Sequence, residues 1–134
     1  MPREMIVRFP GGKRVDAEYK GFVIATDQAI HQGGEGAAPA PFDLFLASIA
    51  TCSGIYVLSF GQRRNIDMSG ATIHMSMRRD RAAGRFDLIK LEIRLPEGFP
   101  KKYRNAVIKS VNQCAVKEHM ENPPEFEVVA TWPE

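Results

Sequence analysis

The order of segments along this chain predicts an α+β fold with mainly antiparallel sheets. Short segments rich in apolar residues are joined by turn residues, which is typical of hairpins. Two longer segments are expected to be helices: one has no charged residue over 17 positions, and the other carries apolar residues at helical spacing. A chain of 134 residues is long enough for one hydrophobic core, so we expect a single domain over residues 1–134.

The first third of the chain predicts three strands followed by a long loop. Turn residues at Pro10–Gly12 favour a hairpin between the first two strands, and Gly21 precedes the third. The strands are expected at Ile6–Phe9, Val15–Lys20 and Phe22–Thr26. From Asp27 to Pro41 the sequence is rich in Gly, Ala and Pro and has no periodicity, which indicates a loop of functional length.

A helix over Pro41–Arg63 is the element around which the rest of the chain is expected to pack. Pro41 suits the first helical position, and Asp43 places a carboxylate in the first turn, where the helix dipole favours it. Apolar residues in Leu44–Phe60 occupy all sides, so the helix should be buried on all sides. One small chain can hardly cover such a helix, and we therefore expect an intimate homodimer.

Three residues form a narrow polar strip along this helix, at offsets of four and seven: Ser48, Cys52 and Ser59. The thiol of Cys52 is expected to face the cavity that this strip lines. Two alternatives stay open. The apolar run approaches the lower limit of about 17–25 residues for a membrane span, although polar residues dilute it and no basic cluster flanks it. The helix could also be a plain core helix in which Cys52 is a small buried apolar residue.

The remaining segments predict a second hairpin, a second helix and a last strand. Alternation over Thr72–Arg78 and Ile89–Leu95 indicates two half-buried strands joined by a turn at Arg81–Gly84. Tyr103–Ala115 has helical spacing and carries Cys114 on its apolar face. Phe126–Thr131 is expected to be the final strand.

Composition excludes several classes of function. The net charge is +2, and acidic residues interrupt the only arginine cluster, so we expect no nucleic-acid partner. The three histidines share no metal-ligand spacing with each other or with the cysteines, and we expect neither a metal nor another cofactor. The first residues lack the apolar core of a secretory signal. A cytoplasmic location without a membrane partner is expected, where two cysteines are more typical of reduced thiols or a redox pair.

Cys52 and Cys114 lie on two different predicted helices, each on a face expected to be buried. If the helices pack together, the thiols could act as an attacking and a resolving pair. A thiolate would cleave the O–O bond of a peroxide and become a sulfenic acid, and the second thiol would condense with it to a disulfide. The alternative is two unrelated buried cysteines, because free cysteine is among the most buried residue types.

The residues around both thiols resemble the OsmC/Ohr family. The pattern Pro41-x-Asp43-Leu44-x-Leu46 leads to Cys52-Ser53-Gly54-Ile55, and Asn112-Gln113-Cys114-Ala115-Val116 follows on the later segment. The resemblance extends from Phe22 to Thr131. It implies an intertwined α+β homodimer with two central helices, and a thiol peroxidase whose disulfide is recycled by an external dithiol. By position, Cys52 matches the peroxidatic cysteine and Cys114 the resolving one.

The sequence departs from the peroxidase branches of that family at two places. Those branches have a glutamate ten residues before the reactive cysteine, where this chain has Phe42, and the nearest acid is Asp43. They also use an arginine to hold the thiolate, and here the best candidate is Arg14, ahead of Arg8 and Lys13. The pattern is closer to the OsmC-like branch with an acid nine residues before the cysteine.

The function expected from the resemblance is reduction of a small apolar organic hydroperoxide in the response to oxidative stress. Cys52 would attack, Cys114 would resolve, and Arg14 with Asp43 would polarise the site. Substrate contacts are expected from three further residues: Phe42, Ser48 and Tyr56. The alternative is a non-peroxidatic OsmC-like protein that binds a small hydrophobic or electrophilic ligand in the dimer cavity, and Phe42 in place of the glutamate favours it.

Overall fold

The computed structural model describes residues 3–133 and confirms the α+β class, with every strand pair antiparallel. The chain forms two compact units that divide between Ala47 and Ser48. The division falls inside the long helix α1 (Pro41–Gln62), so no linker separates the units. Each unit is described by itself, and the single domain expected over residues 1–134 stays a prediction.

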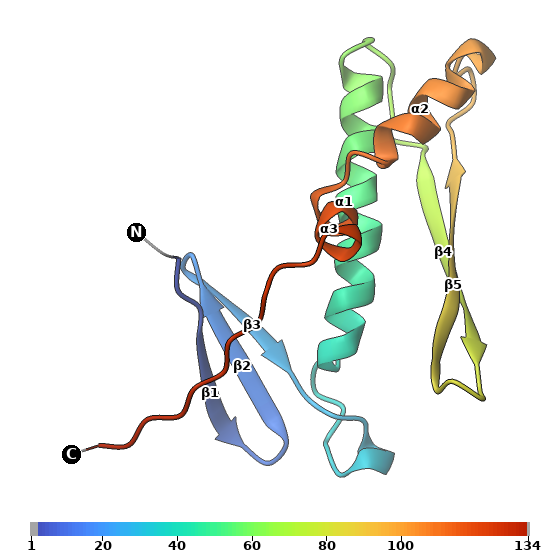
Figure 1. Ribbon diagram of the computed structural model, residues 1–134. Coiled ribbons are helices and arrows are strands. Elements are labelled where there is room, and N and C mark those ends of the chain that lie inside the picture. The colour runs from blue at the N-terminus through green and yellow to red at the C-terminus, as the bar shows by residue number, and fades with distance from the viewer. Residues whose placement is uncertain (1–2, 134) are drawn as a thin grey trace. The chain divides into compact units, whose positions relative to one another are not determined.

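The first unit contains a three-stranded sheet in the order β1-β2-β3 (Figure 1). Its strands are β1 (Ile6–Gly11), β2 (Arg14–Tyr19) and β3 (Phe22–Thr26), close to the predicted ranges. The turn between β2 and β3 uses Lys20 and Gly21, both with positive φ (52° and 82°). Two such residues form the tight turn that matches the twist of antiparallel strands, which explains why a glycine stands there.

Asp27 organises the loop that follows β3. Its side chain is only 1% exposed, and its carboxylate accepts hydrogen bonds from the backbone N–H groups of Gln28 (2.7 Å), Glu35 (3.2 Å) and Ala37 (3.1 Å). The loop contains one short 3₁₀ helix, η1 (Ile30–Gln32). A stretch that has no sequence periodicity is therefore ordered by one buried carboxylate.

α1 begins at Pro41 as predicted, and Asp43 closes its first turn. The Asp43 carboxylate accepts a hydrogen bond from the Ala40 N–H (3.0 Å), while the Asp43 N–H donates to the Ala40 carbonyl (2.9 Å). This carboxylate caps a helix start that has no Ser, Thr or Asn before the proline. At the other end the Arg64 guanidinium donates to the Phe60 carbonyl (3.0 Å), where a cation favours the dipole.

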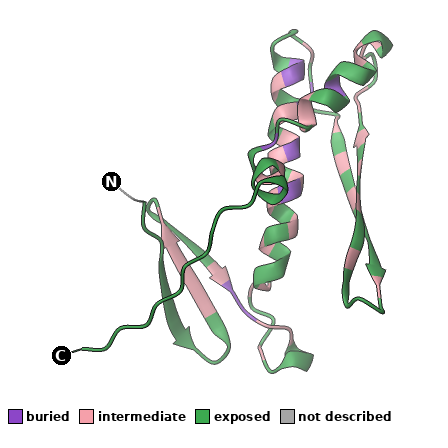
Figure 2. Ribbon diagram, viewed as in Figure 1, coloured by how far each residue is buried: buried purple, intermediate pink, exposed green. Residues whose placement is uncertain are grey.

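In the single chain α1 is not covered on every side, and its complete burial in a homodimer stays a prediction. Figure 2 shows the buried positions of α1 from the middle of the helix to its C-terminal end, at Ile49, Ser53, Val57, Phe60 and Gly61. Large apolar side chains elsewhere on the helix are exposed, including Phe42 (54%) and Ile55 (53%). By length and composition alone α1 could cross a membrane, a test that the core helix of a soluble protein also passes. One chain does not supply enough residues to cover it.

The second unit packs the later part of α1 against a β-hairpin and α2. The hairpin consists of β4 (Thr72–Asp80) and β5 (Arg85–Arg94), whose register pairs Ile73 with Ile93 and Met75 with Leu91. α2 spans Arg104–Val111. The core is formed by Val57, Phe60, Met68 and Val107, with half-buried apolar residues of both strands packed against it.

The single helix predicted over Tyr103–Ala115 is wrong in its second part. The structure has a 3₁₀ turn η2 (Lys101–Tyr103), then α2, then a break, then α3 (Ala115–Glu121). Cys114 lies in the break with extended backbone dihedrals (φ −57°, ψ 125°) and is the N-cap of α3. It is therefore not on the apolar face of a continuous helix.

The strand predicted over Phe126–Thr131 does not form in this chain. Residues 123–133 have no helical or strand assignment, and Phe126 and Val128 are 87% and 93% exposed. A strand requires a neighbour whose backbone groups it can pair with, and among residues 3–133 none pairs with this segment. The segment has the alternating apolar pattern of a strand but no neighbouring strand to pair with among the described residues.

Candidate active site

The second unit brings Cys52 and Cys114 together, and a hydrogen bond joins the two thiols. Cys52 comes from the interior of α1, whereas Cys114 comes from the break before α3. Both are free cysteines. Cys52 is half-buried, and Cys114 is 2% exposed. The pair expected from the resemblance is therefore in contact.

The local fold fixes Cys114 from both sides. Its N–H donates to the Val111 carbonyl at the end of α2 (3.1 Å), and its carbonyl accepts from the Glu118 N–H in α3 (3.0 Å). On α1, the Ser53 hydroxyl next to Cys52 donates to the Ile49 carbonyl (2.8 Å) within the helix. The backbone thus holds one thiol at a break between helices and the other on a regular helix.

Burial and hydrogen bonds act in opposite directions on the Cys52 thiol. Burial is the largest single influence and raises its pKa, but hydrogen bonds from the Cys114 thiol and from the backbone N–H groups of Val116 and Ala115 together outweigh it. The net result is a Cys52 pKa below the ordinary value of 9.0. The thiolate, which is the nucleophilic form, is therefore favoured at Cys52.

The pKa of Cys114 moves the other way, above 9.0. Burial is the main cause, and the hydrogen bond to Cys52 adds to it, while backbone hydrogen bonds from Lys117 and Val116 partly offset both. Cys114 therefore keeps its proton and donates it toward Cys52. The two thiols thus differ in pKa, with Cys52 below and Cys114 above the ordinary value.

The polar strip expected on α1 is half-buried at all three positions, Ser48, Cys52 and Ser59, and Tyr56 is half-buried as well. The cavity expected in front of Cys52 stays a prediction, because two cavities of this unit are lined by other residues. One, of about 850 Å³, lies between β5 and α2, and the other, of about 510 Å³, lies between α1 and the start of β4. Neither cysteine lines either of them.

The other predicted site residues belong to the first unit. Arg14 on β2 has its guanidinium 3.7 Å from the Asp16 carboxylate. Asp43 caps α1, and the Phe42 ring lies 5.4 Å from the Phe45 ring, measured between centroids. The roles of Arg14, Asp43 and Phe42 toward the thiol stay predictions.

Two features of the structure, one in each unit, were missed from the sequence. The backbone donors at Ala115 and Val116 exist because the chain breaks at Cys114, and the helical spacing across that point gave no sign of a break. Asp27 was treated as part of an irregular loop. An aspartate at the head of a Gly-rich segment is a recognised signal for hydrogen bonds to the following backbone, and it could have been used.

The OsmC family model, described as OsmC-like protein, matches residues 33–129, so this chain belongs to that family. No curated protein matches the chain.

Several solved structures share the fold at low sequence identity. An osmotic stress induced and detoxification response protein from Psychrobacter arcticus 273-4 is 22% identical over 85% of both chains, with a TM-score of 0.71. An OsmC-like protein from Mycoplasma pneumoniae is 12% identical over 92% of this chain and 89% of its own, with a TM-score of 0.70. The organic hydroperoxide resistance protein OhrB of Bacillus subtilis is 16% identical over 92% and 93%, with a TM-score of 0.58.

Proposed function

We propose that this protein reduces organic hydroperoxides through a thiol cycle and contributes to the oxidative stress response. The observation that carries the proposal is the hydrogen-bonded pair of thiols whose pKa values move in opposite directions. Family membership supports it, since relatives with the same fold are named organic hydroperoxide resistance proteins. The proposal names Cys52 as the attacking residue and Cys114 as the resolving residue.

The first step oxidises Cys52 by two electrons. Its thiolate sulfur attacks the distal peroxide oxygen, an S–O bond forms, and the O–O bond breaks. The departing alkoxide takes a proton and leaves as the alcohol, while Cys52 becomes a sulfenic acid. The half-buried position of Cys52 permits contact with a small substrate, and its lowered pKa supplies the thiolate.

The second step joins the two residues in a disulfide. The Cys114 sulfur attacks the sulfenic sulfur, an S–S bond forms, and the hydroxyl group leaves as water after taking the Cys114 proton. An external dithiol then reduces the disulfide by exchange and is itself oxidised to a disulfide. This requirement for a reductant is consistent with a cytoplasmic location, where thiols are kept reduced.

The remaining parts of the site follow the family resemblance. Arg14 is proposed to hold the thiolate and Asp43 to orient that cation, with Arg8 and Lys13 as alternatives. Phe42, Ser48 and Tyr56 are proposed to contact the substrate, and the Phe42–Phe45 ring pair favours an apolar one. A homodimer is proposed because large apolar side chains of both units are exposed in the single chain.

The test is a titration of free thiols before and after one equivalent of cumene hydroperoxide, with wild type and Cys52→Ser. We expect rapid loss of two thiols in wild type and none in the variant. Cys114→Ser should accumulate sulfenic acid at Cys52 and then overoxidise. Normal disulfide turnover in Cys114→Ser would remove the resolving role, and intact wild-type thiols after an hour would remove the peroxidase role.

The second candidate is a non-peroxidatic protein that binds a small hydrophobic or electrophilic ligand. Two observations favour it: Phe42 stands where the peroxidase branches have a glutamate, and the cavity of about 510 Å³ beside α1 is lined mostly by apolar residues. In that case the thiols persist in the titration, and a hydrophobic fluorescent probe binds with equal affinity to wild type and Cys52→Ser.

A further inference from the structure

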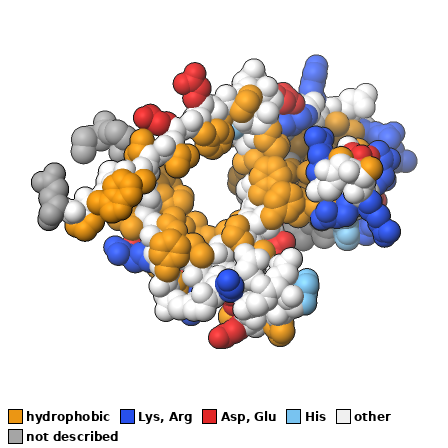
Figure 3. All heavy atoms as spheres, turned by 60° about the horizontal axis from the view of Figure 1, so that its bottom comes forward, with side chains coloured by type: hydrophobic (Ala, Val, Ile, Leu, Met, Phe, Trp, Pro, Cys, Tyr) orange, Lys and Arg blue, Asp and Glu red, His pale blue; other side chains and the backbone are white. Residues whose placement is uncertain are grey.

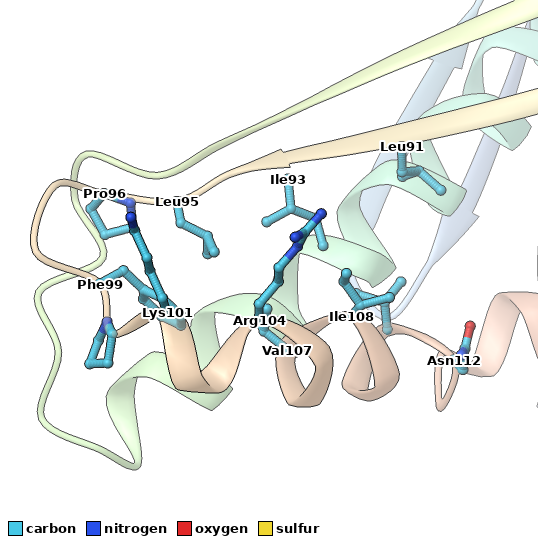
Figure 4. A pocket seen from close by; sticks show the side chains of 12 residues that line it. Leu91, Ile93, Leu95, Pro96, Phe99, Lys101, Arg104, Val107, Ile108 and Asn112 are labelled. Carbon is cyan, nitrogen blue, oxygen red and sulfur yellow. The ribbon is translucent and has the colours of Figure 1, made fainter.

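We propose that the groove between β5 and α2 binds an amphiphilic organic anion with a single aliphatic chain, as a ligand site separate from the thiol pair. The groove lies within the second unit and has a volume of about 850 Å³ (Figure 4). This is within the range of about 300–1,000 Å³ that is usual for small-molecule sites. Its lining includes neither cysteine and no residue of α1.

The walls of the groove are apolar along most of its length. Leu91, Ile93 and Leu95 of the β5 segment alternate along the strand, so all three face the same side. Opposite them, Val107 and Ile108 contribute from α2, with Val107 1% exposed. The strand residues span about 14 Å at about 3.4 Å per residue, which suits an extended aliphatic chain.

Two cations line this groove, Lys101 near its Pro96 end and Arg104 near its middle. Lys101 and Arg104 are one helical turn apart, and Figure 4 shows both side chains extending from the helix toward β5, Lys101 toward Pro96 and Arg104 toward Ile93. Their aliphatic stems line the groove while the charged heads stay at its edge. Within the described part of the chain, neither cation forms a salt bridge.

The polarity of the groove defines its ligand. A carboxylate beside Arg104 would accept two parallel hydrogen bonds from the guanidinium, and the positive charge of Lys101 would add to the attraction. The chain of the ligand would then run toward Leu91 and Ile108, where no charged residue lines the groove. An amphiphilic cation would meet like charges at the same place, so the site discriminates by the sign of the head group.

The experiment measures binding of three probes of equal chain length to the full-length protein by calorimetry: dodecanoate, its methyl ester and dodecyltrimethylammonium, all below their aggregation limits. We expect dodecanoate to bind at least about tenfold more tightly than the other two, because only it is attracted by both cations. The double variant K101Q/R104Q should lose that advantage. Raising the salt concentration should weaken dodecanoate binding selectively.

Matched variants separate this site from the thiol pair and from general attraction of anions to surface cations. K90Q/K102Q removes two exposed cations that do not line the groove and should bind dodecanoate like wild type. Ile108 is 50% exposed, so Ile108→Asn should leave the fold intact and weaken dodecanoate binding through the chain. The double variant C52S/C114S should bind unchanged, which keeps this proposal independent of the thiol cycle.

Four results would overturn the proposal. The methyl ester or the ammonium probe could bind as tightly as dodecanoate, or K101Q/R104Q could match K90Q/K102Q. Vesicles of anionic diacyl lipid could bind more tightly than dodecanoate and depend on the same two cations, which would assign the groove to a membrane surface. Ile108→Asn could change the oligomeric state without changing dodecanoate binding, which would assign the groove to a second copy of the chain.

Discussion

The Cys114 thiol acts on Cys52 as a hydrogen-bond donor before any oxidation takes place. That hydrogen bond is the largest of the three influences that lower the Cys52 pKa. A thiolate fraction at a fixed pH rises as the pKa falls, and each pKa unit changes it by about tenfold while the pH is below the pKa. We therefore expect the neighbouring thiol to increase the thiolate fraction of Cys52 in the reduced protein.

Replacing Cys114 by alanine should raise the Cys52 pKa and slow its alkylation. In Cys114→Ala the donor is lost, so iodoacetamide should react with Cys52 several-fold more slowly at pH 7. Cys114→Ser keeps a hydroxyl donor and should lie between alanine and wild type. The measurement is the pH profile of the alkylation rate by mass spectrometry. Identical profiles for wild type and Cys114→Ala would contradict the assigned hydrogen bond.

A second prediction at the level of residues concerns Asp27 and the dependence of folding stability on pH. Hydrogen bonds from the backbone of Ala37, Gln28 and Glu35 hold its folded pKa below the ordinary 3.8, against a smaller opposing effect of burial. A lowered folded pKa means that the carboxylate stabilises the fold above pH 3.8. That stabilisation is lost as the pH falls through the lower folded pKa.

Asp27→Asn should therefore be less stable than wild type at pH 7, with a difference that narrows in acid. An amide offers one acceptor oxygen where the loop requires two, and its NH₂ group meets a backbone donor. Urea unfolding at pH 7 and near pH 3 measures both effects, with Glu97→Gln as an exposed control. An equal loss at both pH values would indicate a purely steric role for the side chain.

Residue-level sequence reasoning identified both cysteines but not what surrounds them. The family pattern gave the positions of Cys52 and Cys114, and their contact depends on packing between distant segments. The place of Asp27 before a Gly-rich segment signals a hydrogen bond to the backbone that follows, but not the bonds to Glu35 and Ala37, which lie eight and ten residues away. Pairing at that range is a property of the folded loop rather than of local spacing.

At the level of elements, two glycines of α1 have opposite surroundings. A Cβ at Gly61 would lie 2.3 Å from both Cγ and Sδ of Met68, which is closer than real contacts allow. A Cβ at Gly54 would meet only Ile73 Cδ1, at 3.9 Å. Met68 is 8% exposed and belongs to the core, so Gly61 lets that side chain approach the helix backbone.

Gly54→Ala and Gly61→Ala should therefore change stability in opposite directions. Gly54→Ala should raise the free energy of unfolding by about 0.5–1 kcal/mol, since alanine favours a helix and its contact with Ile73 is an ordinary one. Gly61→Ala should lower the free energy of unfolding by about 1–2 kcal/mol, because the added methyl group displaces the Met68 side chain. Urea unfolding measures both changes. In a double-mutant cycle with Met68→Ala, the destabilisation caused by Gly61→Ala should be smaller when Met68 has been shortened. Additive effects in that cycle would contradict the contact.

Element boundaries were predictable only where local signals set them. The β4–β5 hairpin follows from strict alternation on both sides of a turn, and the start of α1 follows from Pro41 and Asp43. The break at Cys114 has no Gly or Pro to announce it, and the apolar spacing continues across it. The segment after Asn122 has the pattern of a strand, but a pattern cannot supply the neighbouring strand that pairing requires.

For the whole molecule, the main feature is apolar surface that the single chain leaves uncovered. Figure 3 shows large hydrophobic side chains on the face that it presents. In the first unit, Phe9, Phe22 and Val23 are 80%, 70% and 64% exposed. In the second unit, Val128 and Trp132 are 93% and 80% exposed. Exposure of this extent in a water-soluble protein marks an interaction surface.

We therefore expect a homodimer of twice the chain mass of 15.0 kDa, measured by sedimentation equilibrium. Val128→Asp should shift the protein toward the monomer, because a charge on an apolar interface is desolvated without a partner. Val128 is already 93% exposed in the single chain, so the variant monomer should remain folded. Thr131→Asp adds the same charge at an exposed polar position nearby and is the control. A wild-type protein that sediments at the mass of one chain at micromolar concentration would contradict the dimer, and equal dissociation by both variants would place Val128 outside its interface.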